Sequence, residues 1–177
     1  MRAVRHVFPS LLLIFAASGC VVDGTLDAAG GGTLTMRYRL VSIANLDHMK
    51  SRLASPDIML TQASMAPDKQ ATFSLAFRDV RALSTAPAFA DAQVALADEA
   101  DGLRTLTVTL PKQPGTLPAP YVAYLGGELR VTLTMPGDIV RSNATSVNGR
   151  SATWTQKIDE LQQQPSTKFS ITFRPAG

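Results

Sequence analysis

The sequence predicts an α+β fold, built mainly from an antiparallel sheet of hairpins, with one main helix near the N-terminus and one or two short helices. Apolar and polar residues alternate in several segments of the 177-residue chain, which is the period of half-buried strands. Turn sequences join these segments, so hairpins are expected rather than long crossovers. Apolar residues recur at helical spacing chiefly over residues 43–53. Many hairpins and few helices are typical of an antiparallel α+β domain.

The N-terminus has the order of a bacterial lipoprotein signal. Two arginines are followed by an apolar run, and the small pair Ser18-Gly19 stands before Cys20, the only cysteine. Residues 1–19 are therefore predicted to be a cleaved signal peptide, because the run is too short for a permanent membrane span. Cys20 is the predicted site of lipid attachment. A buried thiol or a remnant of an ordinary secretory signal are the alternatives for this cysteine.

The remaining chain is expected to hold a tether and one domain. Residues 20–32 are rich in small residues and end in three glycines, so they predict a flexible tether. Residues 33–177 are predicted to form a single α+β domain. Loss of the signal leaves 158 residues, with 15 basic against 14 acidic, so the net charge falls from +3 to +1. A nearly neutral exported chain lacks the basic surface of a nucleic-acid binder, and that class of partner is excluded.

The first elements are expected directly after the glycines. Residues 33–40 alternate as a strand, and residues 43–53 have the helical period and end at a Ser-Pro pair. Residues 58–65 and 71–77 flank a turn sequence and predict a hairpin. One helical turn is expected over residues 79–84.

A second hairpin is expected from residues 92–96 and 106–110, which flank a polar connection. Residues 112–120 contain three prolines and predict a loop, because proline removes a backbone donor. Residues 121–125 are compatible with a short helix that ends at two glycines.

The C-terminal third predicts three more strand segments. Residues 129–135 alternate clearly and end at a Pro-Gly pair. An Asn-Gly pair, which favours a type I′ turn, joins residues 145–147 to residues 150–155 as a hairpin. Residues 168–174 predict a last strand with its aromatic residues and isoleucine buried.

The candidate chemical residues do not form a recognisable catalytic site. His48 stands beside Asp47 on the expected helix, but sequence neighbours do not share a helix face, so a general-base pair is not favoured. Asp98, Glu99 and Asp101 lack the ligand spacing of a calcium loop and are read as a solvated hairpin tip. No cofactor or metal site is predicted.

Three further candidates are weighed in the same way. Asp159 and Glu160 are adjacent carboxylates, which seldom face each other across a substrate as glycoside hydrolysis requires. The serines lie in no nucleophile motif. Trp154, the single tryptophan, fits a sugar platform or a lipid interface, but a packing role on its strand is preferred. An enzyme is therefore not expected, and the catalytic residues are given as none.

Two stretches of the C-terminal half resemble the LppM-domain family of bacterial lipoproteins. Residues 129–143 form a strand that ends at Pro-Gly and is followed by Ser-Asn, and residues 147–154 form a Gly turn that leads into a Thr-Trp strand. The matching positions are Pro136, Gly137, Ser142, Asn143, Gly149, Thr153 and Trp154. The resemblance implies an α+β domain held at a membrane, and for the mycobacterial member a role in binding glycolipid. It implies no catalytic residues, and the matching positions have the character of turn and packing residues.

The expected function is therefore that of a lipid-anchored, non-enzymatic lipoprotein of the cell envelope, which binds an amphipathic ligand such as a lipid or glycolipid. Its expected place is the outer membrane facing the periplasm, or the cell surface, because Val21 rather than Asp follows Cys20. The alternative is a structural accessory subunit of an envelope protein assembly. A ligand binder should contain an apolar concavity with a few polar groups at its rim. An assembly subunit should instead expose an apolar patch or an unprotected strand edge.

Overall fold

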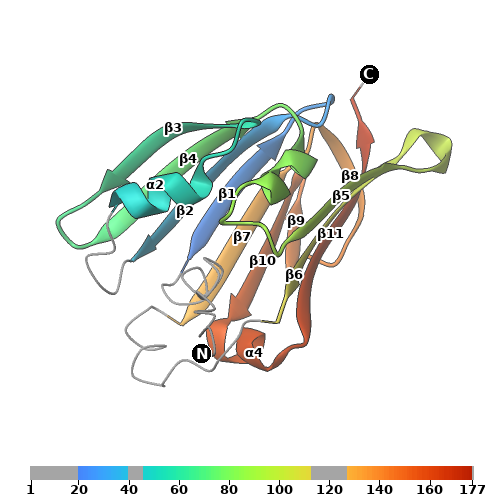
Figure 1. The fold of residues 1–177 in the computed structure, drawn as a ribbon. Helices are drawn as coiled ribbons and strands as arrows, with labels where there is room; N and C mark the ends of the chain where they lie inside the picture. Colours follow the sequence, from blue (N-terminus) through green and yellow to red (C-terminus); the bar gives the residue numbers. More distant parts are fainter. Residues whose placement is uncertain (1–19, 40–45, 113–126, 177) are drawn as a thin grey trace, which may run out of the picture.

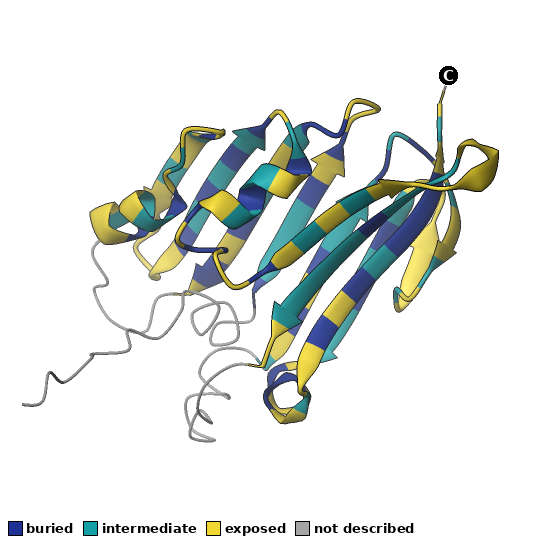
Figure 2. Cartoon of the chain, turned by 45° about the vertical axis from the view of Figure 1, so that its right-hand side comes forward, coloured by how far each residue is buried: buried dark blue, intermediate teal, exposed yellow. Residues whose placement is uncertain are grey.

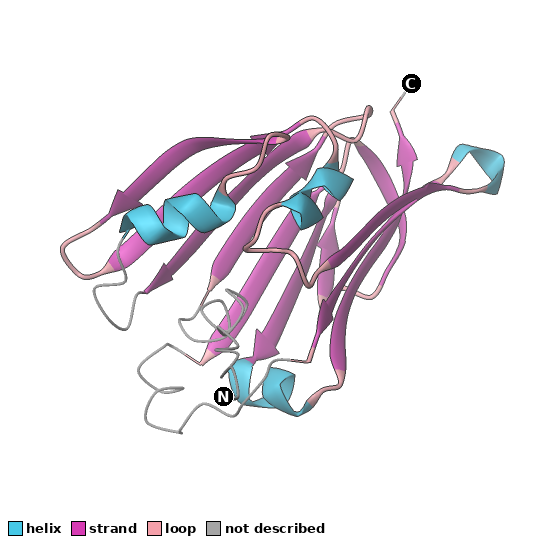
Figure 3. Cartoon of the chain, in the orientation of Figure 1, coloured by secondary structure: helices cyan, strands magenta, loops and turns pink. Residues whose placement is uncertain are grey.

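The computed structural model describes residues 20–39, 46–112 and 127–176, and in these ranges most of the chain is strand (Figure 1, Figure 3). The strands form a large sheet in the order β3-β4-β2-β1-β7-β10-β9 and a small sheet in the order β5-β6-β11-β8. The small sheet lies over the β7 and β10 half of the large sheet, and helix α2 lies over the other half (Figure 1). The described fold is thus a two-layer arrangement whose second layer is partly sheet and partly helix.

The strand bounds follow the predicted alternation in most places. The large sheet contains β1 (Val21–Leu26), β2 (Gly32–Arg39), β3 (Ile58–Met65), β4 (Gln70–Phe77), β7 (Glu128–Thr134), β9 (Ser146–Asn148) and β10 (Ser151–Lys157). The small sheet contains β5 (Gln93–Asp98), β6 (Arg104–Pro111), β8 (Gly137–Ser142) and β11 (Ser166–Pro175). The helical elements are α2 (Leu46–Leu53), the 3-10 helices η1 (Val80–Thr85) and η2 (Ala100–Gly102), and α4 (Ile158–Gln163).

The predicted tether over residues 20–32 is wrong, because most of it is folded. Its first half forms β1, the middle strand of the large sheet, which pairs antiparallel with β2 and parallel with β7. Both edges of β1 are therefore hydrogen-bonded, and its even-numbered residues from Cys20 to Leu26 face the interior. The folded part of the chain begins at Cys20 rather than at Thr33.

The prediction of one main helix near the N-terminus is not confirmed. Helix α2 has eight residues, and only Met49 and Leu53 of them are buried, so it is comparable in size with the other short helices. Residues 40–45, where the expected helix begins, and the short helix expected at 121–125 lie outside the described residues. The coarser prediction, a mostly antiparallel sheet with a few short helices, agrees with the structure.

The core lies between the two layers, and Figure 2 shows its alternating buried positions along the strands. Trp154 of β10 meets Phe169 of β11 edge to face, with ring centroids 5.3 Å apart, so it joins the large sheet to the small one. Tyr38 and Phe73 stack on the α2 side of the core at 5.6 Å. Strand β8 and helix α4 were not predicted from the sequence, whereas both hairpin pairings of the first half were.

Candidate functional site

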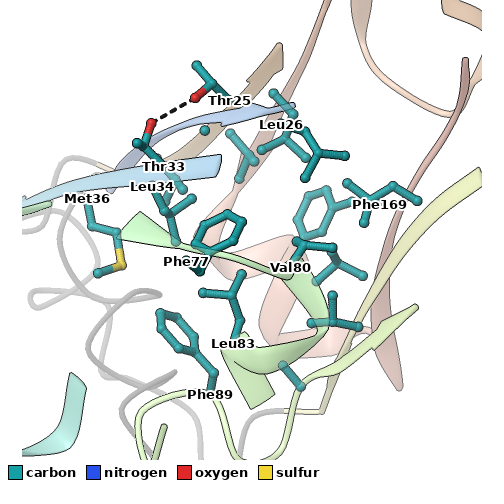
Figure 4. Close-up of a pocket in the computed structure, with 18 of the residues that line it drawn as sticks. Thr25, Leu26, Thr33, Leu34, Met36, Phe77, Val80, Leu83, Phe89 and Phe169 are labelled. Atoms are coloured by element: carbon teal, nitrogen blue, oxygen red, sulfur yellow. Dashed lines mark hydrogen bonds between the residues drawn. The ribbon is translucent and has the colours of Figure 1, made fainter. Parts of the chain in front are cut away.

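An apolar cavity of about 140 Å³ lies between the two sheets, with η1 beside it. Figure 4 shows the rings of Phe77, Phe89 and Phe169 and the side chains of Val80 and Leu83 gathered around it. The remaining lining comes from inward-facing positions of the paired strands. These include Val22, Leu26, Leu34, Met36, Leu129, Val131, Leu133 and Met135 from the large sheet, and Val94, Leu106, Val108 and Leu110 from the small sheet.

The period of two along each strand builds the large-sheet wall of the cavity. Val22 of β1 is in register with Met36 of β2 and with Val131 of β7, so one cross-strand row presents three apolar side chains. Gly24 follows Val22 on the same face of β1. A Cβ added there would lie 2.7 Å from Leu133 Cδ2, so the missing side chain gives room to the neighbouring leucine.

The 3-10 helix η1 is fixed beside the cavity by its first residues. The carboxylate of Asp79 accepts a hydrogen bond from the Arg81 backbone N–H at 2.9 Å and an ion pair from the Arg81 guanidinium at 2.6 Å. The Val80 N–H donates to the carbonyl of Gly30 at 2.8 Å, which ties η1 to the turn between β1 and β2. Val80 and Leu83 are thereby held against the cavity.

The polarity of the lining restricts what the cavity can do. Thr25 and Thr33 are its hydroxyl-bearing residues, and their oxygens are hydrogen-bonded to each other at 2.8 Å. No charged side chain is among the described residues that line it. An apolar cavity of about 150 Å³ stays dry and accepts a molecule the size of benzene. This cavity is therefore suited to a segment of hydrocarbon and unsuited to a charged substrate.

Cys20, the predicted lipid attachment site, lies close to the end of this cavity. Its carbonyl accepts a hydrogen bond from the Arg130 N–H at 2.8 Å, and its side chain belongs to the buried core. Burial raises the pKa of the Cys20 thiol well above its ordinary value. Burial, followed by the proximity of Cys20, likewise raises the pKa of Tyr38.

The structure keeps the other candidate residues apart from the cavity. His48 is exposed on α2, and the carboxylate of Asp47 accepts from Lys50 Nζ at 3.0 Å. Asp159 and Glu160 are exposed in the first turn of α4. None of these side chains contributes to the lining in the part of the chain that is described.

The acidic hairpin tip between β5 and β6 is held by arginines. Asp98 pairs with Arg104 at 2.8 Å, and Glu99 pairs with Arg141 at 2.9 Å, while Asp101 is exposed. These cations occupy the carboxylates that were considered as calcium ligands. Within the described ranges, no group of three or more histidine, cysteine or acidic residues is placed to hold a metal ion.

Trp154 has the packing role that was preferred for it. It is buried, and its indole Nε1–H donates to Asn143 Oδ1 at 3.0 Å. Asn143 Oδ1 also accepts from the Ser170 N–H at 2.8 Å, and Asn143 Nδ2 donates to the Lys168 carbonyl at 2.7 Å. These two residues, both part of the resemblance noted in the sequence, therefore hold the two sheets together.

Sequence reasoning missed the wall that β1 contributes to the cavity. The residues of this wall are Val22, Gly24 and Leu26, and the glycine interrupts what would otherwise be an alternating apolar pattern. The loop after η1, with Phe89 and Ala92, was also not assigned to a site. The spacing of Val22 and Leu26 by four residues is the signal that was present, since both fall on one face of a strand.

Comparison with known proteins gives a fold relationship. No family model matches the sequence, and no curated protein matches it either. The solved structure of the folded domain of the LppM protein from Mycobacterium tuberculosis is similar, with a TM-score of 0.56 and 10% sequence identity over 99% of this chain and 97% of that one. The two chains thus share a fold. In the described residues, no helix is both long and apolar enough to cross a membrane.

Proposed function

We propose that this chain is a non-enzymatic, lipid-anchored lipoprotein of the LppM-domain type, which binds the hydrocarbon part of an amphipathic lipid or glycolipid in the cavity between its sheets. The observation that carries the proposal is the cavity itself, enclosed by apolar side chains and free of charged groups among the described residues. The shared fold with the LppM domain supports the same class of protein. The ligand's polar headgroup must remain outside, because the lining offers it no charged partner.

The size of the cavity sets the strength of binding. A cavity that accepts benzene holds roughly six carbons of an acyl chain. At about 0.8 kcal/mol per buried CH₂, this segment contributes about 5 kcal/mol before the cost of association. Such a site discriminates weakly among chains and needs either a high local concentration of lipid or further contacts with a headgroup. A location at a membrane surface provides the first of these conditions.

The anchor is proposed to be a lipid on Cys20, with the chain attached to the cell envelope at the outer membrane or the cell surface. In this modification, the thiol S–H bond is replaced by an S–C bond to the diacylglyceryl group of a membrane phospholipid, whose phosphate headgroup leaves with the proton. A buried thiol whose pKa is raised is a poor nucleophile. Modification therefore has to precede the docking of β1 into the sheet.

Binding of a fluorescent fatty acid, cis-parinaric acid, tests the cavity. The assay uses the full chain exported with Cys20→Ala, which carries no lipid of its own. Fluorescence is expected to rise on titration, and Ala92→Phe, which fills the cavity, is expected to abolish the rise. Ala76→Phe is the matched control, because Ala76 faces away from the cavity on β4. Equal binding by the Ala92→Phe chain, or none by its parent, would contradict the proposal.

A second candidate function is that of an accessory subunit, and the edge of the large sheet favours it. Strand β3 is an edge strand of eight residues without charge or proline, and Met59 and Met65 on it are 63% and 43% exposed. Edge strands normally carry charges, prolines or bulges that prevent pairing, and β3 has only a register shift after Leu60. A partner strand is therefore able to extend the sheet at β3.

A further inference from the structure

The strand register places Cys20 at one end of the cavity. Cys20 precedes Val22 by two residues on the same face of β1, a distance of about 7 Å along a strand. Val22, Met36 and Val131 form the last complete cross-strand row that lines the cavity in that direction. Leu129, which lies one step earlier on the neighbouring strand β7, lines the cavity as well.

The backbone of Cys20 is fixed in the sheet. Its carbonyl accepts the Arg130 N–H at 2.8 Å, and the paired part of β1 begins at the next residue. No spacer therefore separates the proposed attachment point from the cavity. A group attached to the Cys20 sulfur starts inside the apolar layer and not at the end of a flexible arm.

We propose that one acyl chain of the lipid on Cys20 occupies the cavity in the resting lipoprotein, and that a ligand lipid has to exchange with it. This inference rests on the proposed function, because both need a cavity that accepts an acyl chain. It adds that the site is regulated by the protein's own modification. The remaining hydrocarbon of the anchor stays in the bilayer.

Mass action favours the attached chain over a free one. Six buried CH₂ groups give a dissociation constant of roughly 0.2 mM for a free chain. A group tethered by a short link has an effective concentration in the millimolar range, which is above that constant. The tethered chain also loses no independent translational freedom on entering the cavity. Transfer from bilayer to cavity is close to neutral in hydrophobic terms, so filling the void decides the balance.

Photochemical cross-linking in native membranes tests the inference on the full lipidated chain. Leu133 is replaced by photoleucine, its diazirine analogue, because it lines the cavity two residues after Val131. Thr132 receives the same replacement as a control, because it is on the opposite face of β7. Met36 is replaced by photomethionine in an independent variant. After irradiation and digestion, mass spectrometry identifies what each position has captured.

A product that joins residue 133 to the peptide with lipidated Cys20, seen also from residue 36 and absent from residue 132, is the expected result. Capture of free phospholipid alone by residues 133 and 36 would overturn this inference while supporting the proposed function. Absence of any lipid product from both cavity positions would overturn the inference and the proposed function together. Slow exchange of the Arg130 amide in the lipidated chain, as in Cys20→Ala, is the accompanying result, and fast exchange would show that Cys20 has left the sheet.

Discussion

At the scale of single residues, Asn143 connects more of the fold than any sequence pattern suggested. Its side chain accepts from the Trp154 indole and from the Ser170 N–H, and it donates to the Lys168 carbonyl. Asn143→Ala removes all three bonds and leaves a buried indole N–H to find water, so we expect a loss of about 1–2 kcal/mol in the free energy of unfolding. Urea unfolding followed by Trp154 fluorescence measures it. Asn143→Asp keeps both acceptor bonds and should cost less, and equal losses would contradict this role.

Asp79 provides a pH-dependent contribution at the start of η1. Its hydrogen bonds with Arg81, together with the charge of that guanidinium, hold the pKa of the Asp79 carboxyl below its ordinary value. The folded state therefore binds this proton less readily than the unfolded chain. The contribution to stability is complete above the unfolded pKa, near 3.9, and is lost as the pH falls through the lower folded value.

We expect the stability difference between the parent chain and Asp79→Asn to be present at neutral pH and to disappear in acid below that window. Unfolding by urea at a series of pH values measures this difference. The Asp79 side chain is 39% exposed, so high salt should reduce the difference at neutral pH as well. A difference that is constant across the acid range would show that Asp79 acts only as a hydrogen-bonded cap.

At the scale of elements, the sequence predicted the strands whose partners are close in the chain. The hairpins β3-β4, β5-β6 and β9-β10 each have a turn sequence and two alternating segments, so local information was sufficient. Strand β1 was read as a tether, because Gly24 stands where an apolar residue would have completed its pattern. Its pairing with β7 is parallel and joins residues about a hundred positions apart, which no local pattern contains. The cavity depends on β1, so it could not be assembled from the sequence either.

The uncharged edge strand β3 gives a prediction about association. Met59→Lys places a charge on the exposed edge, and we expect it to reduce self-association without a large change in folding stability. Static light scattering of concentrated protein, together with urea unfolding, measures the two effects. Ala76→Lys is the matched control, because Ala76 lies directly opposite Met59 in the register but on the inner strand β4. If both variants associate like the parent chain, β3 is not an interaction edge.

At the scale of the whole molecule, the position of β1 determines where the domain begins. Removal of residues 20–32 would take away the middle strand of the large sheet, leaving β2 and β7 each without one partner and opening the cavity along its length. An unpaired, buried backbone group costs about 1–3 kcal/mol, and several would be created at once. This loss approaches the entire stability of an ordinary domain.

We therefore expect a chain of residues 33–177 to lack a cooperative unfolding transition, whereas residues 20–177 with Cys20→Ala should unfold in a single one. Circular dichroism during heating, and the fluorescence of Trp154, compare the two chains. A cooperative transition in the shorter chain would mean that β2 and β7 close the gap without β1. In that case β1 would be a detachable strand, and a lipid pulling on Cys20 could draw it out of the sheet. The expected failure of the shorter chain instead makes the anchor part of the folded domain, which holds the cavity directly at the membrane surface.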